Sequence, residues 1–503
     1  MSAPFTLCAK IGTERLLVTG LCLAAALRVF VYAAAFPFFS NGDEDLHFDL
    51  VTQYSAGQPP RVFDVLQDSS LRFISLYCSP EFLRGPEDFP DGKIPTPLWK
   101  LSSAEAAPVI AATREGWQSE VNWESSQPPL YYVLAGWWWK LGRFVGLGGI
   151  ESLYWIRLLN CLLIFILVWL GYVTARAIAP DQPGLRLGVP ILLAFIPQDV
   201  FYVISNDVLS PVCFGVVFLC VLRWLSADPP SFTLGAITGV AIAATYLTKL
   251  SNLPLLTVAG IVLIARTLAI VRRQPTAAVL AFAALLLCGG IPVVSWMMWS
   301  RSHFIDITGS TTTIALLGWT RKPLKEWWQH PVFSLRGLWI FWSELTSRLW
   351  RGELMWHGRE FSSWTADSFY AIASLLFPGV AMFELRREAG LSTWQRKALL
   401  LAGLCFLAGV AFLGLLSVQF DFGRCIYPSR DHPFFTSGRL IGGALIPFAL
   451  LFTRGVVCLL PGGSNSFRPL AVIAGIAMFA ATSEIFMKHN VFASEHNWYH
   501  LRR

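Results

Sequence analysis

The chain of 503 residues has a net charge of +7 and a mean hydropathy of +0.53, and only 14% of its residues are charged. Because soluble domains contain about 25% charged residues, this composition excludes a set of soluble domains, a disordered chain, a secreted disulfide scaffold and a nucleic-acid-binding protein. In a membrane protein, the excess of 39 Lys and Arg over 32 Asp and Glu is typical of cytoplasmic loops.

Eleven apolar segments are candidates for membrane spans, each of which needs about 20 mostly apolar residues. These segments are 16–38, 157–178, 187–204, 208–225, 232–250, 254–271, 276–299, 366–384, 398–418, 439–460 and 470–487. The expected fold is therefore an all-α polytopic membrane protein with about 11 transmembrane helices.

Two further segments, 129–147 and 331–350, interleave Trp with charged residues, which favours helices that lie in the membrane interface. If neither spans and the N-terminus is cytoplasmic, the basic loops face the cytoplasm, as the positive-inside rule requires. Residues 39–156 and 300–365 then form two large outer loops, and all eight His lie on the outer side. A cleaved signal peptide over residues 1–35 is the alternative, and it leaves these loops outside. We expect a multi-pass protein of the inner (plasma) membrane whose chemistry takes place on the outer face.

An acidic run directly follows the first predicted span. Asp43 and Glu44 begin it, and Asp45, His47 and Asp49 follow closely. In one interpretation, these acids cap the positive N-terminal end of a solvated helix. In the other, a carboxylate lies at headgroup level, where a lipid-linked phosphate presents its substituent, and it takes a proton from an acceptor hydroxyl. General base catalysis of this kind is worth roughly 10²–10⁴-fold.

Two more polar motifs fall on the outer side. Glu124 and Gln127 precede a Pro-Pro pair, which starts a helix well, and that helix carries Tyr131. Asp207 lies in a tight turn between the third and fourth predicted spans, at the membrane rim, where an ionisable group is a functional candidate by default. The same turn also suits a plain helix N-cap, so both interpretations stay open.

Cations at the outer ends of spans run against the positive-inside trend. Lys249 ends the fifth predicted span, and Arg424, Arg430 and Arg439 precede or begin the tenth. A phosphate is the natural anion at such a place, because Arg binds it bidentately and Lys binds it as a point charge. The alternative is that these side chains extend to lipid headgroups. The first interpretation makes Lys249, Arg430 and Arg439 ligands of a donor phosphate.

Together these motifs resemble the GT-C superfamily, polytopic glycosyltransferases that use polyprenyl-phosphate sugars, such as protein O-mannosyltransferases and aminoarabinose transferases. The patterns DE..H, QPPLYY, P…SND, LTKLSNLP and SGRLIGGALIP are most similar to a bacterial branch of predicted membrane proteins in that superfamily. The resemblance is strongest over residues 16–300. It implies a GT-C-like catalytic transmembrane module over 1–300, a second outer loop with an interfacial helix over 301–365, and C-terminal helices with an outer tail over 366–503.

The resemblance also implies roles for single residues. Asp43 resembles the catalytic carboxylate, Glu44 its usual neighbour, and Asp207 the second acidic position near the active site. Glu124 roughly matches an acid that contributes to a metal site in some members. It lies further from the Pro-Pro pair than in those relatives, and Gln127 stands where a Lys or His often occurs. No cofactor is certain from these matches, and a divalent metal is an open alternative.

The predicted function is transfer of a sugar from a polyprenyl-phosphate donor to a lipid, glycan or protein acceptor, with inversion of configuration. The residues expected to bind substrate are His47, Glu124, Gln127 and Tyr131. His303 and His330 are further candidates in the second outer loop. The two outer-loop cysteines, Cys78 and Cys425, are candidates for a disulfide.

A transporter or flippase for a lipid-linked glycan is the alternative function. Transporters tend to place ionisable groups near the bilayer midplane and are often built from repeats. This sequence shows no repeat, and its acidic motifs lie at one rim of the membrane, which favours the enzyme.

Overall fold

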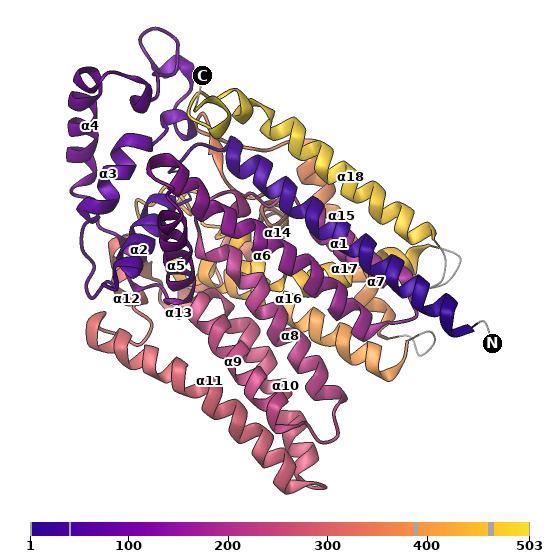
Figure 1. The fold of residues 1–503 in the computed structure, drawn as a ribbon. Coiled ribbons are helices and arrows are strands. Elements are labelled where there is room, and N and C mark those ends of the chain that lie inside the picture. Colours follow the sequence, from indigo (N-terminus) through magenta and orange to yellow (C-terminus); the bar gives the residue numbers. More distant parts are fainter. Residues whose placement is uncertain (1–2, 40–41, 387–390, 461–466, 502–503) are drawn as a thin grey trace.

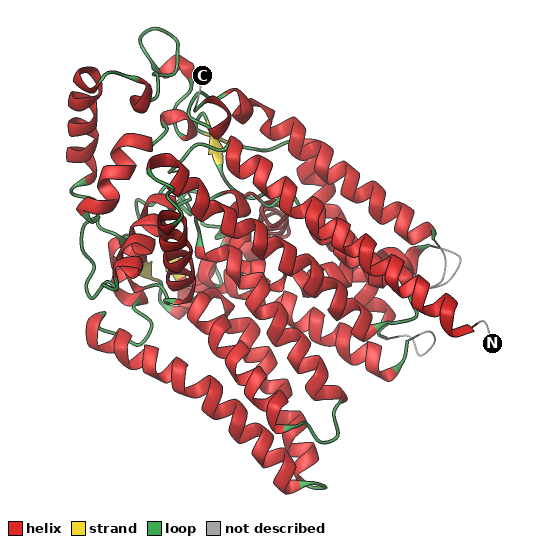
Figure 2. Ribbon diagram, in the orientation of Figure 1, coloured by secondary structure: helices red, strands yellow, loops and turns green. Residues whose placement is uncertain are grey.

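The computed structural model describes residues 3–39, 42–386, 391–460 and 467–501 (Figure 1). These residues are mostly helical, with four two-residue strands (Figure 2). The strand β1 (Thr320–Arg321) pairs antiparallel with β4 (Phe420–Asp421), and β2 (Met355–Trp356) pairs antiparallel with β3 (Arg359–Glu360).

Nine helical segments in the described part of the chain are long and apolar enough to cross a membrane. Their main helices are α1 (Ala3–Ala35), α6 (Gly149–Ile178), α8 (Ser210–Ser226), α10 (Leu253–Val271), α11 (Pro275–His303), α15 (Trp364–Glu384), α16 (Thr393–Gln419), α17 (Leu445–Leu459) and α18 (Arg468–Lys488). Two shorter apolar helices are α7 (Pro183–Phe195) and α9 (Phe232–Thr248). Every predicted span overlaps one of these helices, and the expected all-α polytopic membrane fold is confirmed.

The helix α7 is shorter than the span predicted over 187–204. It ends at Phe195 because Pro197 disfavours helical backbone at the preceding residue, and Ile196 is extended, with ψ 120°. All residues from 196 to 215 are buried. Irregular backbone at membrane depth is tolerated where protein surrounds it, so this segment can carry polar groups inside the bundle.

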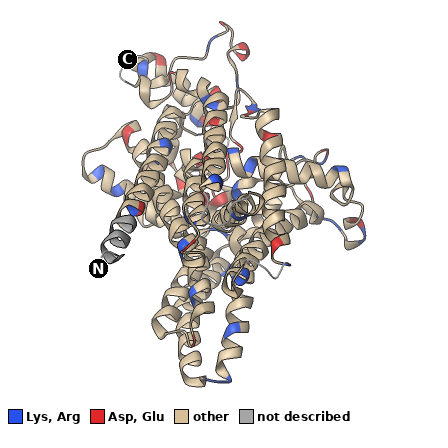
Figure 3. Cartoon of the chain, turned by 90° about the vertical axis from the view of Figure 1, so that its right-hand side faces the viewer, with Lys and Arg blue, Asp and Glu red and all other residues tan. Residues whose placement is uncertain are grey.

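Charged residues are sparse along the long helices (Figure 3). Two of the exceptions pair with each other, because Arg28 of α1 lies 2.9 Å from Glu484 of α18. Glu484 also accepts hydrogen bonds from the Tyr202 hydroxyl and, at 3.3 Å, from Lys488 Nζ. Buried charges are tolerated when they are paired and hydrogen-bonded, and this group joins the first and last membrane helices.

The helices of the two predicted outer loops are short. They are α2 (Glu44–Ala56), α3 (Asp68–Tyr77), α4 (Ser103–Trp117), α5 (Leu130–Phe144), α12 (Ser310–Leu316), α13 (Leu324–Trp327) and α14 (Leu335–Arg351). Neither α5 nor α14 is among the candidate spans, in agreement with the prediction that 129–147 and 331–350 do not cross the membrane. The helices α2–α5 gather at the left of Figure 1, away from the N-terminus of α1.

Tight contacts hold α5 between α2 and α6. Trp138 of α5 and Trp155 of α6 stack with ring centroids 4.5 Å apart, and each indole N–H donates to the other residue's carbonyl. On the other side, a Cβ at Gly136 would lie 3.0 Å from the Ser55 backbone nitrogen of α2. This packing fixes the QPPLYY segment beside the acidic run.

Candidate active site

Asp43 lies at the junction between the first membrane helix and the first outer loop. It is the N-cap residue of α2, and its backbone is left-handed, with φ 61° and ψ 22°. Asp adopts this conformation more readily than most residues. Its side chain is 24% exposed, and Oδ2 accepts a hydrogen bond of 2.9 Å from Arg439 Nη2.

Arg439 connects acids that are far apart in the sequence. It lies in the short 3-10 helix η9 (Gly438–Ala444), directly before α17. Its Nε atom is 3.0 Å from Glu353 Oε1 and 3.7 Å from Asp207 Oδ2. Together with the contact to Asp43, these distances place one guanidinium among three carboxylates.

Glu353 is a site residue that the sequence analysis did not select. It follows α14 in the second outer loop, and its Oε1 accepts a hydrogen bond of 2.6 Å from Ser437 Oγ. Its backbone N–H donates to Asp199 Oδ1 at 3.2 Å. The signal in the sequence was weak, because Glu353 is a lone acid in the run RGELMW.

Lys249 holds Asp207 on the other side of the cluster. Lys249 is the C-cap residue of α9, and its Nζ is 2.7 Å from Asp207 Oδ1. The two side chains are 10% and 1% exposed. Because the pair is largely shielded from water, its attraction is stronger than that of a surface ion pair. It ties α9 to the short 3-10 helix η6 (Asn206–Leu209), which precedes α8.

The charged residues of this cluster affect the pKa of Glu124. Burial raises the pKa of Glu124 to about 7, and the negative charge of Asp43 adds to this effect. The positive charges of Lys249 and Arg439 act in the opposite direction. The protonation state of Glu124 therefore changes near neutral pH.

His47 lies on α2 and is 1% exposed. Burial lowers the pKa of His47 to about 3, and the positive charge of Lys249 also lowers it. Its imidazole is therefore neutral at physiological pH. The Nδ1 atom is 2.9 Å from the Tyr132 hydroxyl.

Gln127 and Tyr131 lie beside the cluster in the QPPLYY segment. Gln127 Oε1 accepts a hydrogen bond of 3.2 Å from Asn206 Nδ2, next to Asp207 in the chain. Tyr131 is 1% exposed and contributes to an apolar groove of about 390 Å³. The groove is also lined by Trp137, Trp138, Leu163 and Leu209. It lies next to η6, so an apolar slot adjoins the charged cluster.

Glu44 has a different environment from Asp43. Its carboxylate pairs with Arg157 of α6, with Nη2–Oε2 2.7 Å and Nε–Oε1 2.8 Å, and both side chains are 0% exposed. It also accepts hydrogen bonds from the backbone N–H groups of Phe39 and Ile204. These contacts hold Glu44 between α1, α6 and the loop after α7, where its side chain is shielded from solvent.

Several candidates lie outside the charged cluster in the described structure. Arg430, whose side chain is 68% exposed, pairs with Asp421 at 3.2 Å. His330 Nε2 is 3.0 Å from the Pro433 carbonyl, and His303 stacks on Trp299. The structure therefore brings together the following predicted residues: Asp43, Glu124, Asp207, Lys249 and Arg439, with His47 and Gln127 beside them.

The donor set does not fit a divalent metal. Within the described ranges, no three His, Cys, Asp or Glu side chains form a group that could hold one. The carboxylates of Asp43 and Asp207 are instead paired with Arg439 and Lys249. Cys78 and Cys425 are both free thiols, so the structure contradicts the disulfide between them.

Two solved structures resemble this chain at low identity. ArnT from Cupriavidus metallidurans, solved bound to undecaprenyl phosphate, is 13% identical with a TM-score of 0.43, and the match covers 95% of this chain and 74% of ArnT. The archaeal oligosaccharyltransferase AglB from Archaeoglobus fulgidus, solved with an inhibitory peptide and a dolichol-phosphate, is 11% identical with a TM-score of 0.44. That match covers 95% of this chain and 56% of AglB, so the chain spans little more than half the length of AglB.

No curated protein matches the sequence. A family model described as "Predicted membrane protein (DUF2142)" matches residues 27–332, which is more than half of the chain. The chain therefore belongs to this family of membrane proteins.

Proposed function

We propose that this protein is a membrane glycosyltransferase that moves a sugar from a polyprenyl-phosphate donor to an acceptor hydroxyl. The observation that carries the proposal is the meeting of Asp43 with Arg439 and the Lys249–Asp207 pair, beside an apolar groove. A lipid-linked sugar phosphate presents the matching features: an apolar tail, an anionic phosphate and a reactive sugar carbon.

Lys249 and Arg439 are the phosphate ligands in this proposal. Each is already paired with a carboxylate, so a bound phosphate shares or displaces those partners. The guanidinium has donors for more than one anion, because its five N–H groups form a planar fork. As the phosphate leaves, the same cations stabilise its growing negative charge, and preorganised electrostatic contacts of this kind are often the largest catalytic contribution.

Asp43 is the general base. Its partly exposed carboxylate accepts the proton of the acceptor hydroxyl while the hydroxyl oxygen attacks the anomeric carbon. The bond between that carbon and the phosphate oxygen breaks, and the phosphate departs with the bonding electron pair. Attack from the side opposite the leaving group inverts the configuration.

The apolar groove beside η6 suits the donor's lipid chain. Tyr131, Trp137 and Leu209 present an apolar surface next to the charged cluster. Burial of isoprenoid carbon there is favourable at about 25 cal/mol per Å² of apolar area. The groove therefore supports a lipid-linked donor over a water-soluble sugar nucleotide.

The test is transfer by the purified full-length protein in liposomes, supplied with labelled polyprenyl-phosphate sugars and with lipids and glycans as acceptors. Transfer of the label to an acceptor, with release of polyprenyl phosphate, is the expected result. Movement of an intact lipid-linked sugar between leaflets, without release of polyprenyl phosphate, contradicts the proposal and indicates a flippase.

A further inference from the structure

The two ring nitrogens of His47 have different environments. The Nδ1 atom lies 2.9 Å from the Tyr132 hydroxyl. Within the described residues, the Nε2 atom has no hydrogen-bond partner, and no Asp or Glu oxygen lies within 4.0 Å of either ring nitrogen. The Nε2 atom is also not fully buried, unlike the unpartnered polar atoms of the interior. A ligand can therefore reach Nε2, while Nδ1 is occupied by the protein.

Tyr132 determines which nitrogen of His47 carries the proton. Tyr132 is 0% exposed, and burial raises the pKa of its phenol well above the usual range, so the hydroxyl keeps its proton. In the described part of the chain, His47 Nδ1 is the one acceptor within hydrogen-bond distance of that hydroxyl. Because a buried donor without an acceptor costs free energy, the hydroxyl donates to Nδ1. The proton of the neutral imidazole is then on Nε2.

The packing around Tyr132 keeps its hydroxyl at this nitrogen. The Tyr132 ring stacks on Tyr54, with ring centroids 5.8 Å apart and an interplanar angle of 20°. It meets the ring of Tyr131 edge to face at 5.6 Å. The close approach of α5 to α2 at Gly136 fixes the two helices that carry Tyr132 and His47. The hydroxyl is therefore preorganised, and so is the proton on Nε2.

The imidazole of His47 lies beside both cations of the charged cluster. The charges of Lys249, Arg439, Asp43 and Asp207 all act on it. The two acids already accept from the two cations, Asp207 from Lys249 at 2.7 Å and Asp43 from Arg439 at 2.9 Å. The Nε2–H group thus lacks an acceptor that a ligand can supply. A phosphate group brings anionic oxygens to the same place, because Lys and Arg both bind it.

We propose that Tyr132 is a positioning residue, which holds His47 in the tautomer whose Nε2–H donates to an oxygen of the lipid phosphate. This inference rests on the proposed function, because it takes the phosphate of the lipid donor as the ligand. The neutral imidazole adds a hydrogen bond without a third positive charge. The released polyprenyl phosphate is therefore held less tightly than three cations would hold it.

Binding of undecaprenyl phosphate to the purified full-length protein tests this inference and needs no sugar transfer. Native mass spectrometry measures Kd, with undecaprenol and inorganic phosphate as controls that lack the phosphate or the lipid. His47→Gln keeps an N–H donor where Nε2 lies and should bind the probe almost as the unmodified protein does. His47→Asn reaches only as far as Nδ1 and should bind about 10- to 100-fold more weakly, because a hydrogen bond to a charged group is lost. Tyr132→Phe should weaken binding about two- to tenfold.

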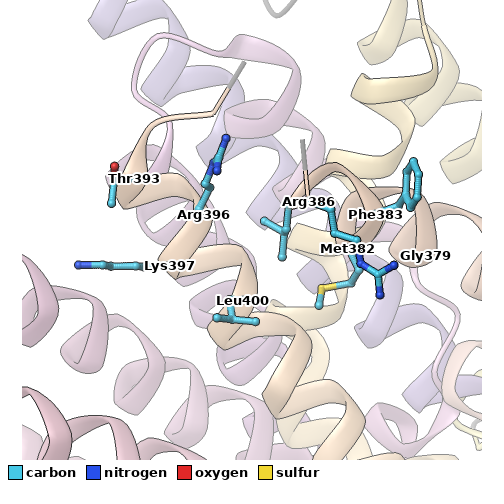
Figure 4. Close-up of a pocket in the computed structure, with 9 residues that line it drawn as sticks. Gly379, Met382, Phe383, Arg386, Thr393, Arg396, Lys397 and Leu400 are labelled. Atoms are coloured by element: carbon cyan, nitrogen blue, oxygen red, sulfur yellow. The ribbon is translucent and has the colours of Figure 1, made fainter. Parts of the chain in front are cut away.

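A second cavity supplies a control for lipid phosphate that binds elsewhere. It has a volume of about 630 Å³ and lies between the end of α15 and the start of α16. Figure 4 shows Arg386 and Lys397 of this cavity pointing away from one another, so they do not converge on one anion. Lys397→Gln should therefore bind undecaprenyl phosphate as the unmodified protein does. A loss with Lys397→Gln as large as that with His47→Asn overturns the inference.

The double variant Tyr132→Phe/His47→Gln separates control of the tautomer from a purely structural role. An amide has no tautomer to set, so Tyr132→Phe should weaken binding no further when His47→Gln is already present. An equal loss from Tyr132→Phe with and without His47→Gln overturns the inference, and so does equal binding by His47→Gln and His47→Asn. If the expected binding pattern is found but the unmodified protein transfers no sugar, the inference is supported and the proposed function is refuted.

Discussion

Replacing Glu44 by Gln tests whether the two adjacent acids after the first helix have separate roles. Glu44 and Arg157 are both 0% exposed and form a salt bridge of 2.7 Å. Removing one partner of a buried pair leaves an uncompensated charge and costs about 3–5 kcal/mol. Asp43→Asn differs, because its side chain is 24% exposed, and Asn also accepts a left-handed backbone. The cost there should be about 1 kcal/mol or less.

Thermal unfolding of the purified protein, followed by Trp fluorescence, measures this difference. An unfolding entropy of about 2.1 cal/mol/K per residue gives roughly 1 kcal/mol per degree for 503 residues. Glu44→Gln should therefore lower Tm by about 3–5 °C, and Asp43→Asn by about 1 °C or less. Asp43→Asn should nevertheless lower sugar transfer by roughly 10²–10⁴-fold. An unchanged Tm for Glu44→Gln, or full transfer activity for Asp43→Asn, refutes the separation of roles.

Three further variants address other parts of the cluster. Arg439→Gln should raise the donor KM about ten- to hundredfold, because a charge-assisted contact to phosphate is lost. The control Arg272→Gln, at the far end of the bundle, should leave the donor KM unchanged. Equal effects of the two variants on KM would contradict the phosphate site. Since the pKa of Glu124 is raised to about 7, its carboxyl is protonated below that pH, and the cluster then carries one negative charge fewer. The donor KM should be lower at pH 6 than at pH 8. Because the donor phosphodiester keeps its charge over that range, the dependence comes from the protein, and Glu124→Gln should remove it. A donor KM that does not change with pH in the unmodified protein would contradict this reasoning. Gly352→Ala should lower Tm, since Gly352 has φ 85° and its new Cβ would collide with the Asp199 carboxylate, and strain of this kind costs about 1–3 kcal/mol. It should also raise the donor KM, because Asp199 accepts the backbone N–H of Glu353, which contacts Arg439. Normal values of Tm and KM would show that Asp199 does not help to position Glu353.

The sequence predicted the membrane helices well, because hydropathy depends on local composition. It did not predict the end of α7 at Phe195, although the signal was present in Pro197. The apolar run continues past that proline, so hydropathy alone extends the predicted span. Only the tertiary structure shows that the backbone after Phe195 is not helical and is buried by other segments. At such places the proline ends the helix, and burial by the surrounding protein allows irregular backbone to follow it.

The site was predicted in part, for a related reason. Each motif identifies its own candidate residues, such as Asp43 and Asp207, but the sequence does not show how close these residues lie in space. The difference between Asp43 and Glu44 depends on Arg157, which is 113 residues away along the chain. Glu353 reaches the site through Arg439 from the second outer loop. Contacts between distant segments leave no periodic pattern in the sequence, so these assignments needed the fold.

The most direct test of the central claim compares strains that lack the protein and are complemented with either Asp43→Asn or Arg272→Gln. Mass spectrometry of their lipids and glycans, at equal membrane levels of each variant, measures the glycosylated product and the lipid-linked donor. The account predicts that Asp43→Asn loses the sugar mass from the product and accumulates the donor, while Arg272→Gln matches the unmodified protein. Normal product with Asp43→Asn would contradict the assignment of sugar transfer to this site.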